Sequence, residues 1–477
     1  MIPKDIVFNS KILVVKQLAY TGTRLLQFGY KVILETWNRL VQPPRKGNTT
    51  HVWIIHRRGE SVRQTSYTAL KEFQVTNLFA PLSRETRRLL DGVPALIDKT
   101  FPLPGRFRSK LSSDVAELSR LLTSGRGQRG LSYLGRPNLL SAYLRFFLPW
   151  NLYRLCRLLP GLDIRLRAND IVTDLGCGPF TFAAALWICR PDLRRIPLEF
   201  QCIDRSGPAL EAGRKFFASL VSETLTGKAL TSETPASETS PWKIRSSKAE
   251  LGTGKTKPAT LVCAANVFNE MYGDISRCNA ETLKRNAEKS ARLLENYTLD
   301  KAESTVLVVE PGFPRCGEFI GLLRNALMER GHRPLSPCPH DNDCPLLEPT
   351  QLLGKKRWCH FAFETDDAPR ALQRLSASAR LPKERAVLSF VFTETTKAPQ
   401  GDNASAQQQA RIISDAFPLP RQRLGRYGCS RQGLVLLAGE ENLIEKTSSG
   451  ALVNAVLKKG ERDAKSGALI AEPSAVP

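Results

Sequence analysis

The chain has 477 residues, of which 42% are hydrophobic and 24% are charged, and this composition excludes a disordered or fibrous protein. A chain of this length is expected to form two or three domains with hydrophobic cores. Its eleven cysteines are dispersed between Cys156 and Cys429. This spread excludes the dense disulfide framework of a small secreted domain and indicates a reducing compartment.

The net charge of +23 is concentrated in the N-terminal third. Of the 69 Lys and Arg residues, 28 precede residue 171, together with only 11 of the 46 Asp and Glu residues. A basic surface of this size attracts a polyanion through counterion release, and structured RNA or DNA is the usual partner. The alternatives are a well-solvated surface that serves solubility and, with weaker support, a membrane surface.

The first residues, Met-Ile-Pro-Lys-Asp, lack the basic start and apolar core of a signal peptide. No stretch reaches the roughly 18 uncharged apolar residues of a membrane span. Apolar residues recur at helical spacing over 11–40, which is more typical of a core-facing helix than of a membrane anchor. We therefore expect no membrane association and a cytoplasmic protein, with the mitochondrial matrix as the alternative.

Residues 1–150 are predicted to form a basic, mainly helical N-terminal region. Periodic apolar positions, separated by Pro and Gly, predict helices over 66–73, 84–90, 112–122 and 138–158.

Strands and helices alternate over 151–335. Strands are predicted at 171–174, 198–204, 260–265 and 305–310, and helices at 181–189, 208–220, 279–296 and 317–330. This alternation predicts an α/β fold with a parallel sheet covered by helices on both faces. Residues 222–258, rich in Ser, Thr, Pro, Gly and Lys, are interpreted as a flexible insertion.

The remaining residues divide into a cysteine-rich segment and a tail. Residues 336–440 contain three clustered cysteines, followed by strand-like runs at 386–394 and 433–438 that are predicted to close the sheet as an antiparallel edge pair. Residues 441–477 are interpreted as a basic tail.

A glycine turn follows the first predicted strand, in Asp174-Leu-Gly176-Cys-Gly178-Pro. Such a turn lets the backbone approach a ligand without a Cβ atom in the way. Asp204 ends the second strand, where its carboxylate can accept hydrogen bonds from ribose hydroxyls. The arrangement resembles the S-adenosylmethionine site of class I methyltransferases, although Phe180 stands where many members have a third glycine.

Asn269 lies in Asn266-Val-Phe-Asn269-Glu270, which follows the strand predicted at 260–265. The polar pair Asn269 and Glu270 either contacts cofactor or substrate, or caps the next helix. The Pro-Pro-aromatic motif that is common in methyltransferases acting on amino groups is missing here. The sequence therefore assigns no catalytic residue.

The cysteine-rich segment contains Cys338-Pro-His340-Asp-Asn-Asp-Cys344-Pro and Trp358-Cys359-His360. Prolines on both sides stiffen the loop, so three thiolates can converge on a metal. Cys429 is the best further sulfur donor, with His340 or His360 as alternatives, for a zinc site or an iron–sulfur cluster. Reduced structural thiols or a catalytic Cys338 are the other interpretations.

Four motifs, taken in chain order, resemble those of the small-ribosomal-subunit methyltransferase-like family, which has bacterial and mitochondrial members. They are Val309-Glu310-Pro311-Gly312, Cys-Pro-His-Asp, Cys-Pro and Trp-Cys-His-Phe. The likeness covers roughly residues 130–440 and includes Tyr133-Leu-Gly-Arg136-Pro. It implies a class I methyltransferase fold with a four-iron four-sulfur cluster before the last two strands.

In this resemblance Cys338, Cys344 and Cys359 occupy cluster-ligand positions. The family places its fourth cysteine within or after the final strand, whereas Cys429 precedes that strand here. The resemblance also implies work on the small ribosomal subunit and its rRNA. We therefore expect an S-adenosylmethionine-dependent, iron–sulfur RNA methyltransferase, or alternatively a non-catalytic RNA-binding assembly factor in which cofactor and metal are structural; the oligomeric state is not predicted.

Overall fold

The computed structural model describes the following parts of the chain: residues 30–33, 50–56, 62–67, 76–123, 133–226, 240–253, 256–272, 275–299, 303–347, 357–395 and 409–474. The chain divides into two compact units, Met1–Phe73 with residues 475–477, and Gln74–Ser474. Among the helices of the described ranges, none is long and apolar enough to cross a membrane.

The first unit contains an antiparallel sheet with the strand order β1–β2–β3, made of β1 (Tyr30–Ile33), β2 (Thr50–His56) and β3 (Val62–Tyr67). The prediction of a mainly helical N-terminal region is therefore wrong at these positions. The β2 sequence Val-Trp-Ile-Ile consists of β-branched and aromatic residues, which favour strands. Most of the helix predicted over 66–73, and most of the stripe over 11–40, lie outside the described residues.

Among the described residues, helices first occur in the second unit, where the other three N-terminal predictions are confirmed. They are α2 (Arg84–Thr100), α3 (Gly105–Arg108), α4 (Leu111–Leu122), and the continuous run of α5 (Pro137–Ala142), a π-helical turn η3 (Tyr143–Phe147) and α6 (Leu148–Leu158). Helix α2 packs against α6 and against the helices at 181–189 and 207–226. These helices therefore belong to the same compact unit as the strands that follow them in the chain. The boundary between the two units falls after Phe73 instead of at the predicted residue 150.

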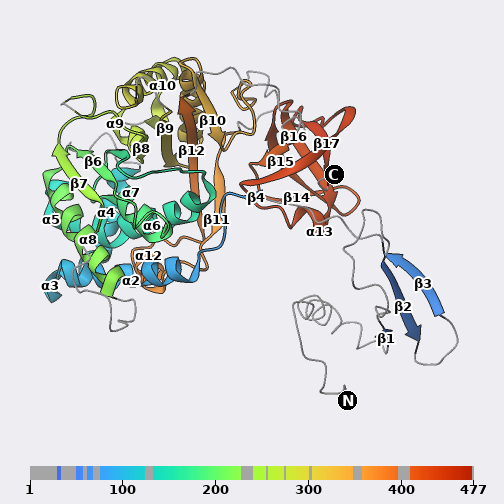
Figure 1. Ribbon diagram of the computed structural model, residues 1–477, viewed down its shortest axis with the longest axis horizontal. Coiled ribbons are helices and arrows are strands. Elements are labelled where there is room, and N and C mark those ends of the chain that lie inside the picture. Colours follow the sequence, from blue (N-terminus) through green and yellow to red (C-terminus); the bar gives the residue numbers. More distant parts are fainter. Residues whose placement is uncertain are drawn as a thin grey trace. The chain divides into compact units, whose positions relative to one another are not determined.

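The centre of the second unit is an eight-stranded sheet (Figure 1). Its main path runs β10 (His332–Ser336), β12 (Arg385–Thr395), β9 (Thr305–Pro311), β8 (Leu261–Ala265), β5 (Ile171–Leu175), β6 (Glu199–Asp204) and β7 (Lys243–Lys248), and β11 (Phe361–Glu364) pairs with β12. The strands from β9 to β7 are parallel, and β12 is antiparallel to both of its neighbours on the path.

Helices cover both faces of this sheet, as predicted. The longer ones are α7 (Thr181–Cys189), α8 (Gly207–Thr226), α10 (Ala280–Glu295) and α11 (Pro314–Met328). Successive residues of β9 enter different cores: Val306 and Val308 pack with α10 and α11, whereas Leu307 and Val309 join the core of α6, α7 and α8. Strands that are buried on both faces need continuous apolar runs, which explains why the sequence located them well.

The remaining short elements connect these layers. They are η2 (Tyr133–Gly135), η4 (Leu159–Gly161), α9 (Phe268–Met271), η5 (Ile275–Arg277) and α12 (Arg370–Ser378).

Part of the segment 222–258 is regular structure, so its interpretation as a flexible insertion was wrong there. Helix α8 continues to Thr226, and β7 forms the edge of the sheet beside β6. Trp242, directly before β7, is buried and packs on Phe200 with 4.9 Å between ring centroids. Residues 227–239 and 254–255 lie outside the described residues. An edge strand needs few apolar residues, so Lys-Ile-Arg-Ser-Ser-Lys resembles a loop in composition.

Residues 409–474 fold into a second, separate sheet (Figure 1). Its strands are β13 (Gln409–Ile412), β14 (Phe417–Leu419), β15 (Arg423–Ser430), β16 (Gly433–Glu440), β17 (Ala451–Arg462) and β18 (Leu469–Ser474), with α13 (Glu441–Ile444) after β16 and β4 (Thr76–Asn77) beside β17. Because β13 pairs with both β15 and β17, five strands close into a barrel.

This barrel corrects two expectations. Strand β12 lies inside the central sheet and β16 belongs to the barrel, so the two do not form a closing edge pair. The segment 441–477, interpreted as a basic tail, contains two barrel strands. Residues such as Ala451, Ala455 and Ala471 fill a narrow interior, and small side chains give a weak hydrophobic signal.

Replacing Trp242 by Ala tests whether the segment before β7 is folded. Its indole packs on Phe200 and Trp187, and its Nε1 donates a hydrogen bond to the Leu193 carbonyl at 3.1 Å. Loss of a large buried side chain is expected to lower the free energy of unfolding by about 3–5 kcal/mol, measured by urea denaturation. The exposed neighbour Lys243→Ala is the control, and equal stability of the two variants would contradict a folded β7.

Candidate functional site

The glycine turn joins β5 to α7. Gly176 and Gly178 have φ angles of 63° and 53°, in the left-handed region that favours glycine. A Cβ atom on Gly176 would lie 2.7 Å from Cγ2 of Val267, so this position also needs the smaller residue for space. A Cβ atom on Gly178 would have only the Tyr143 hydroxyl near it, at 3.9 Å, because Gly178 faces a cavity.

Asp204, at the end of β6, is held by backbone hydrogen bonds. Its Oδ2 accepts from the Gly178 N–H at 2.9 Å, and its Oδ1 accepts from the Ser206 N–H at 2.7 Å. Burial raises the pKa of this carboxyl, while the two N–H groups act in the opposite direction. The carboxylate therefore fixes the glycine turn and still lines the cavity.

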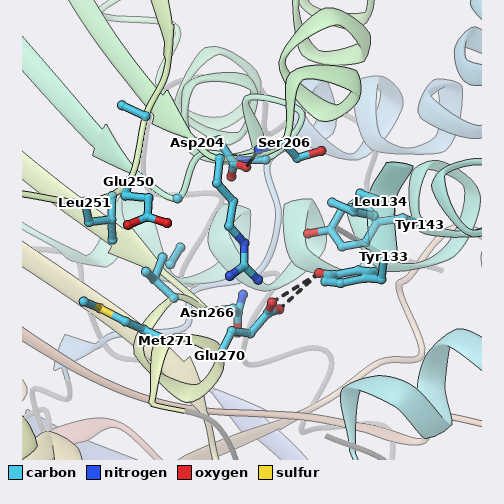
Figure 2. Close-up of a pocket in the computed structure, with 16 residues that line it drawn as sticks. Tyr133, Leu134, Tyr143, Asp204, Ser206, Glu250, Leu251, Asn266, Glu270 and Met271 are labelled. Atoms are coloured by element: carbon cyan, nitrogen blue, oxygen red, sulfur yellow. Dashed lines mark hydrogen bonds between the residues drawn. The ribbon is translucent and has the colours of Figure 1, made fainter. Parts of the chain in front are cut away.

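The cavity has a volume of about 350 Å³ and lies at the carboxyl ends of the parallel strands (Figure 2). Its walls come from the glycine turn, Asp204–Ser206 after β6, Ala249–Leu251 after β7 and Ala265–Val267 after β8. This edge of an α/β sheet, where the strand order reverses between β5 and β8, is where such folds bind ligands.

Acidic and aromatic side chains face each other across the cavity. Figure 2 shows Tyr133 and Tyr143 on one side, with Glu250 and Leu251 opposite. The Tyr133 hydroxyl donates to the Glu270 carboxylate, with distances of 3.2 and 3.4 Å to its two oxygens. Burial, followed by the charges of Glu270 and Asp204, raises the pKa of Tyr143. Arg205, after β6, also lines the cavity. With three carboxylates and one guanidinium, the lining suits a ligand that carries positive charge, hydrogen-bond donors and an anionic group.

Glu310, at the end of β9, holds the turn that follows β8. Its carboxylate accepts hydrogen bonds from the N–H groups of three successive residues: Val267 at 3.1 Å, Phe268 at 2.8 Å and Asn269 at 3.3 Å. The side chain is fully buried, and burial raises its pKa to about 8. These bonds fix the position of Asn266, which has a φ angle of 58° and lines the cavity.

Three of the five predicted cofactor residues, Gly176, Gly178 and Asp204, line the cavity together. Asp174 and Asn269 do not; both are buried, and each has a side-chain oxygen that finds no hydrogen-bond partner among the described residues. Burial, followed by the charge of Asp204, raises the pKa of Asp174 well above its ordinary value.

Four residues that shape this site were not predicted from the sequence. Tyr133 and Glu310 stood within quoted family motifs but had no role assigned to them. Glu250 follows the unpredicted strand β7. Tyr143 lies within a predicted helix, where an aromatic residue gives no signal for a binding site.

The four predicted metal ligands lie in three parts of the chain. Cys338 and Cys344 lie in the loop after β10, Cys359 precedes β11, and Cys429 lies on β15 of the barrel. Burial raises the pKa of the Cys429 thiol well above its ordinary value, and the other three cysteines raise it further. The imidazole Nε2 of His340 lies 3.1 Å from the Cys429 Sγ atom.

The ring of the alternative ligand His360 is engaged elsewhere, because it stacks on Trp358 and its Nδ1 lies 3.0 Å from the Trp358 carbonyl oxygen. In the parts of the chain that the structure describes, no group of three or more His, Cys, Asp or Glu side chains is arranged to hold a metal ion. The thiols are thus within electrostatic range of one another without forming a compact coordination shell.

The strand order defines the class of fold. Numbered along the chain, the seven strands of the main path lie in the order 6-7-5-4-1-2-3, and the seventh is antiparallel to its neighbours. Together with the glycine turn after the first strand, this order is the class I methyltransferase fold.

The family comparison adds to this assignment. The family model described as mitochondrial small ribosomal subunit Rsm22 matches residues 227–423, which confirms the resemblance expected from the sequence. The matched segment includes Cys338, Cys344 and Cys359 but neither the glycine turn nor Cys429. No curated protein matches the chain significantly.

Solved methyltransferase structures resemble the chain only distantly. They include the plantazolicin methyltransferase BpumL in complex with SAH (13% identity, TM-score 0.27, covering 66% of this chain and 99% of that one). A precorrin-6y C5,15-methyltransferase from Geobacter metallireducens has 9% identity and a TM-score of 0.27, covering 52% of this chain and 87% of its own. Because these scores are low, the fold assignment rests on the strand order.

Replacing Glu310 by Gln tests the buried carboxyl beneath the site. A carboxyl pKa raised from 4.5 to about 8 means that the folded state keeps a proton that the unfolded state releases. This contribution to stability is complete below about pH 4.5 and is lost as the pH rises through about 8. We expect the free energy of unfolding of the native protein to fall over this range relative to that of the Gln variant, measured by urea denaturation at several pH values.

The exposed Glu303→Gln, just before β9, serves as the control. Parallel pH profiles for the native protein and Glu310→Gln would show that the carboxyl is ionised in the folded state.

Proposed function

We propose that this protein is an S-adenosylmethionine-binding, methyltransferase-like factor of the small ribosomal subunit that carries an iron–sulfur cluster. The observation that carries the proposal is the acid-lined cavity at the glycine turn of a class I methyltransferase sheet. The family resemblance supplies the small subunit as the partner and supports the mitochondrial matrix as the compartment.

The cavity suits S-adenosylmethionine in shape and charge. Asp204, Glu250 and Glu270 supply carboxylates for a ligand whose ammonium and sulfonium groups are cationic and whose ribose and adenine donate hydrogen bonds. Gly176 and Gly178 leave the backbone open at the turn, and Leu251 and Met271 offer apolar surface. When bound, this cofactor supplies an electrophilic methyl group. Asp174 and Asn269 are proposed to support the turns of the site from beneath.

Two functions fit this cavity. The first is methyl transfer to small-subunit rRNA; the second is a non-catalytic assembly role in which the bound cofactor stabilises the fold. The second is favoured by the turn after β8, Asn266-Val-Phe-Asn269, because it lacks the Pro-Pro-aromatic motif of amino-group methyltransferases. Transfer of a labelled methyl group to small-subunit rRNA would establish the first, and cofactor binding without transfer the second.

The cysteine group is proposed to hold the iron–sulfur cluster through Cys338, Cys344, Cys359 and Cys429. Four thiolates are suitable ligands for either such a cluster or zinc. The family resemblance favours the cluster. Bound metal contributes folding free energy, and here it would join the loop after β10 to strand β15 of the barrel.

Two buried arginines beside the cysteine group favour a negatively charged metal centre there. Arg324 on α11 is only 2% exposed, and its Nη2 donates to the carbonyl oxygens of His340 and Asn342 at 2.9 and 2.7 Å. Arg411 on β13 is 7% exposed, and it donates to the carbonyl oxygens of Pro337 and Gly450.

In the described chain, all of these hydrogen bonds go to uncharged oxygens, including that of Arg324 to the Asn325 side chain. Buried cations without a counter-charge are costly. Four thiolates around a metal would carry the negative charge that offsets both guanidinium groups.

The cofactor proposal is tested by Gly178→Ala. Its new methyl group would enter the cavity and contact no protein atom closer than 3.9 Å. We expect at least a tenfold weaker affinity for S-adenosylmethionine by isothermal titration calorimetry, equivalent to about 1.4 kcal/mol.

Gly331→Ala is a matched control, because Gly331 also has a positive φ, of 84°, and open space around its Cβ position. It bears the same kind of backbone strain away from the cavity. Unchanged affinity in Gly178→Ala would place the cofactor elsewhere, and no binding by the native protein would remove the proposal.

The metal proposal is tested on protein purified without oxygen, which should be brown. Cys344→Ser is expected to abolish the visible absorption and the bound iron, and to make residues 336–440 sensitive to proteolysis. Cys278→Ser, at a half-buried cysteine ahead of α10, should keep both. A colourless native protein with stoichiometric zinc would refute the cluster and identify a zinc site.

A further inference from the structure

The C-terminal barrel has a specific topology. Numbered along the chain as β13, β15, β16, β17 and β18, its strands close in the order 1-2-3-5-4-1. The third and fifth strands are parallel, all other pairs in the ring are antiparallel, and α13 lies between the third and fourth strands. This is the arrangement of the OB fold, a five-stranded Greek-key barrel.

OB folds bind oligonucleotides on the face of their second and third strands and on two flanking loops. The corresponding strands here are β15 and β16, and the loops are 413–422 and 463–468. The first loop contains β14, which forms an antiparallel hairpin with β15. If the barrel binds a nucleic acid, its topology points to this face and these loops.

Two aromatic rings lie at this location. Phe417 on β14 and Tyr427 on β15 are half-buried, with ring centroids 5.0 Å apart and an angle of 33° between the planes. Gly425 lies beneath Phe417, because a Cβ atom there would come within 3.1 Å of the Phe417 ring and 2.8 Å of Leu419. The glycine therefore lets the aromatic ring lie against the strand.

The same surface is basic. The guanidinium of Arg357, which precedes β11, lies over the Tyr427 ring at 4.6 Å from its centroid. Residues 417–431 contain four arginines and no acidic residue. Arg431 pairs with Asp341 and Arg426 donates to the Ser414 and Ile444 carbonyl oxygens, so Arg421 and Arg423 supply the basic charge for phosphates. Aromatic rings combined with arginines are the surface on which single-stranded nucleic acids stack their bases, while the cations contact the phosphates.

We propose that the β14–β15 hairpin of this OB-type barrel binds a single-stranded segment of RNA by stacking bases on Phe417 and Tyr427. The inference rests on the proposed function for the identity of the partner, since small-subunit rRNA supplies unpaired segments. It adds a second RNA contact, at the opposite end of the sequence from the basic N-terminal third.

The test uses full-length protein and a fluorescein-labelled single-stranded RNA of 12 nucleotides, within the range of about 4–16 that one OB fold covers. Fluorescence anisotropy should show that Phe417→Ala and Tyr427→Ala each weaken binding about tenfold, whereas Tyr427→Phe keeps the ring and the affinity. Val456→Ala, at a 51% exposed position on β17 of the same barrel, should bind like the native protein.

Equal affinity of both alanine variants and the native protein would overturn the proposal and assign RNA binding to another surface. Tighter binding of duplex RNA, or of single-stranded DNA, would overturn it as well. Visible absorption of each variant establishes that the neighbouring Cys429 site is intact. Calorimetry with S-adenosylmethionine on the same proteins distinguishes RNA stacking on the hairpin from the proposed function. Weaker RNA binding with normal cofactor binding supports RNA stacking. If no cofactor binds, only the proposed function is removed.

Discussion

The second compact unit depends on how the loop after β10 is held between the methyltransferase sheet and the barrel. Arg324 of α11 binds two carbonyls of this loop from the sheet side, and Arg411 of β13 binds the Pro337 carbonyl from the barrel side. The ion pair of Arg431 with Asp341 adds a contact at 3.2 Å. Since carbonyl oxygens carry only partial charge, two buried guanidinium groups make this junction electrostatically incomplete until thiolate charge accumulates beside them.

The cavity proposed to hold the cofactor depends on different interactions. Its two key carboxylates, Asp204 and Glu310, are held by backbone N–H groups of the turns after β5 and β8. These bonds lock both turns of the switch point to the ends of neighbouring strands. The backbone of both turns is therefore held in place beside the cavity, and another part of its wall comes from Tyr133 of η2 and Tyr143 of η3.

How many of the strands could be predicted from the sequence depended on how far their side chains are buried. Strands with continuous apolar runs, such as β5 and β9, were predicted nearly to the residue because both of their faces are buried. The edge strand β7 and the barrel strand β17 were missed, since one is largely exposed and the other combines small residues with Lys458-Lys-Gly-Glu. Periodicity reports the burial of side chains, and these two strands bury few large ones.

The site shows the same division. The glycine turn and Asp204 follow from local sequence, because each is defined by its position at the end of a strand. Glu250 depends on a strand that the composition concealed. Asp174 and Asn269 were placed in the cavity because a sequence does not show which way a side chain points, and both point into the protein interior.

The position of Cys429 has a consequence for biosynthesis. The strand that carries it belongs to a ring that β18 completes, and β18 ends at Ser474. With the proposed ligand set, three cysteines emerge from the ribosome long before the fourth is in place, because the fourth is positioned only after β18 has been made. A bound cluster would then indicate that the chain has been made through β18 and that the barrel has folded, so chains that stop before β18 would differ from longer ones in their metal content.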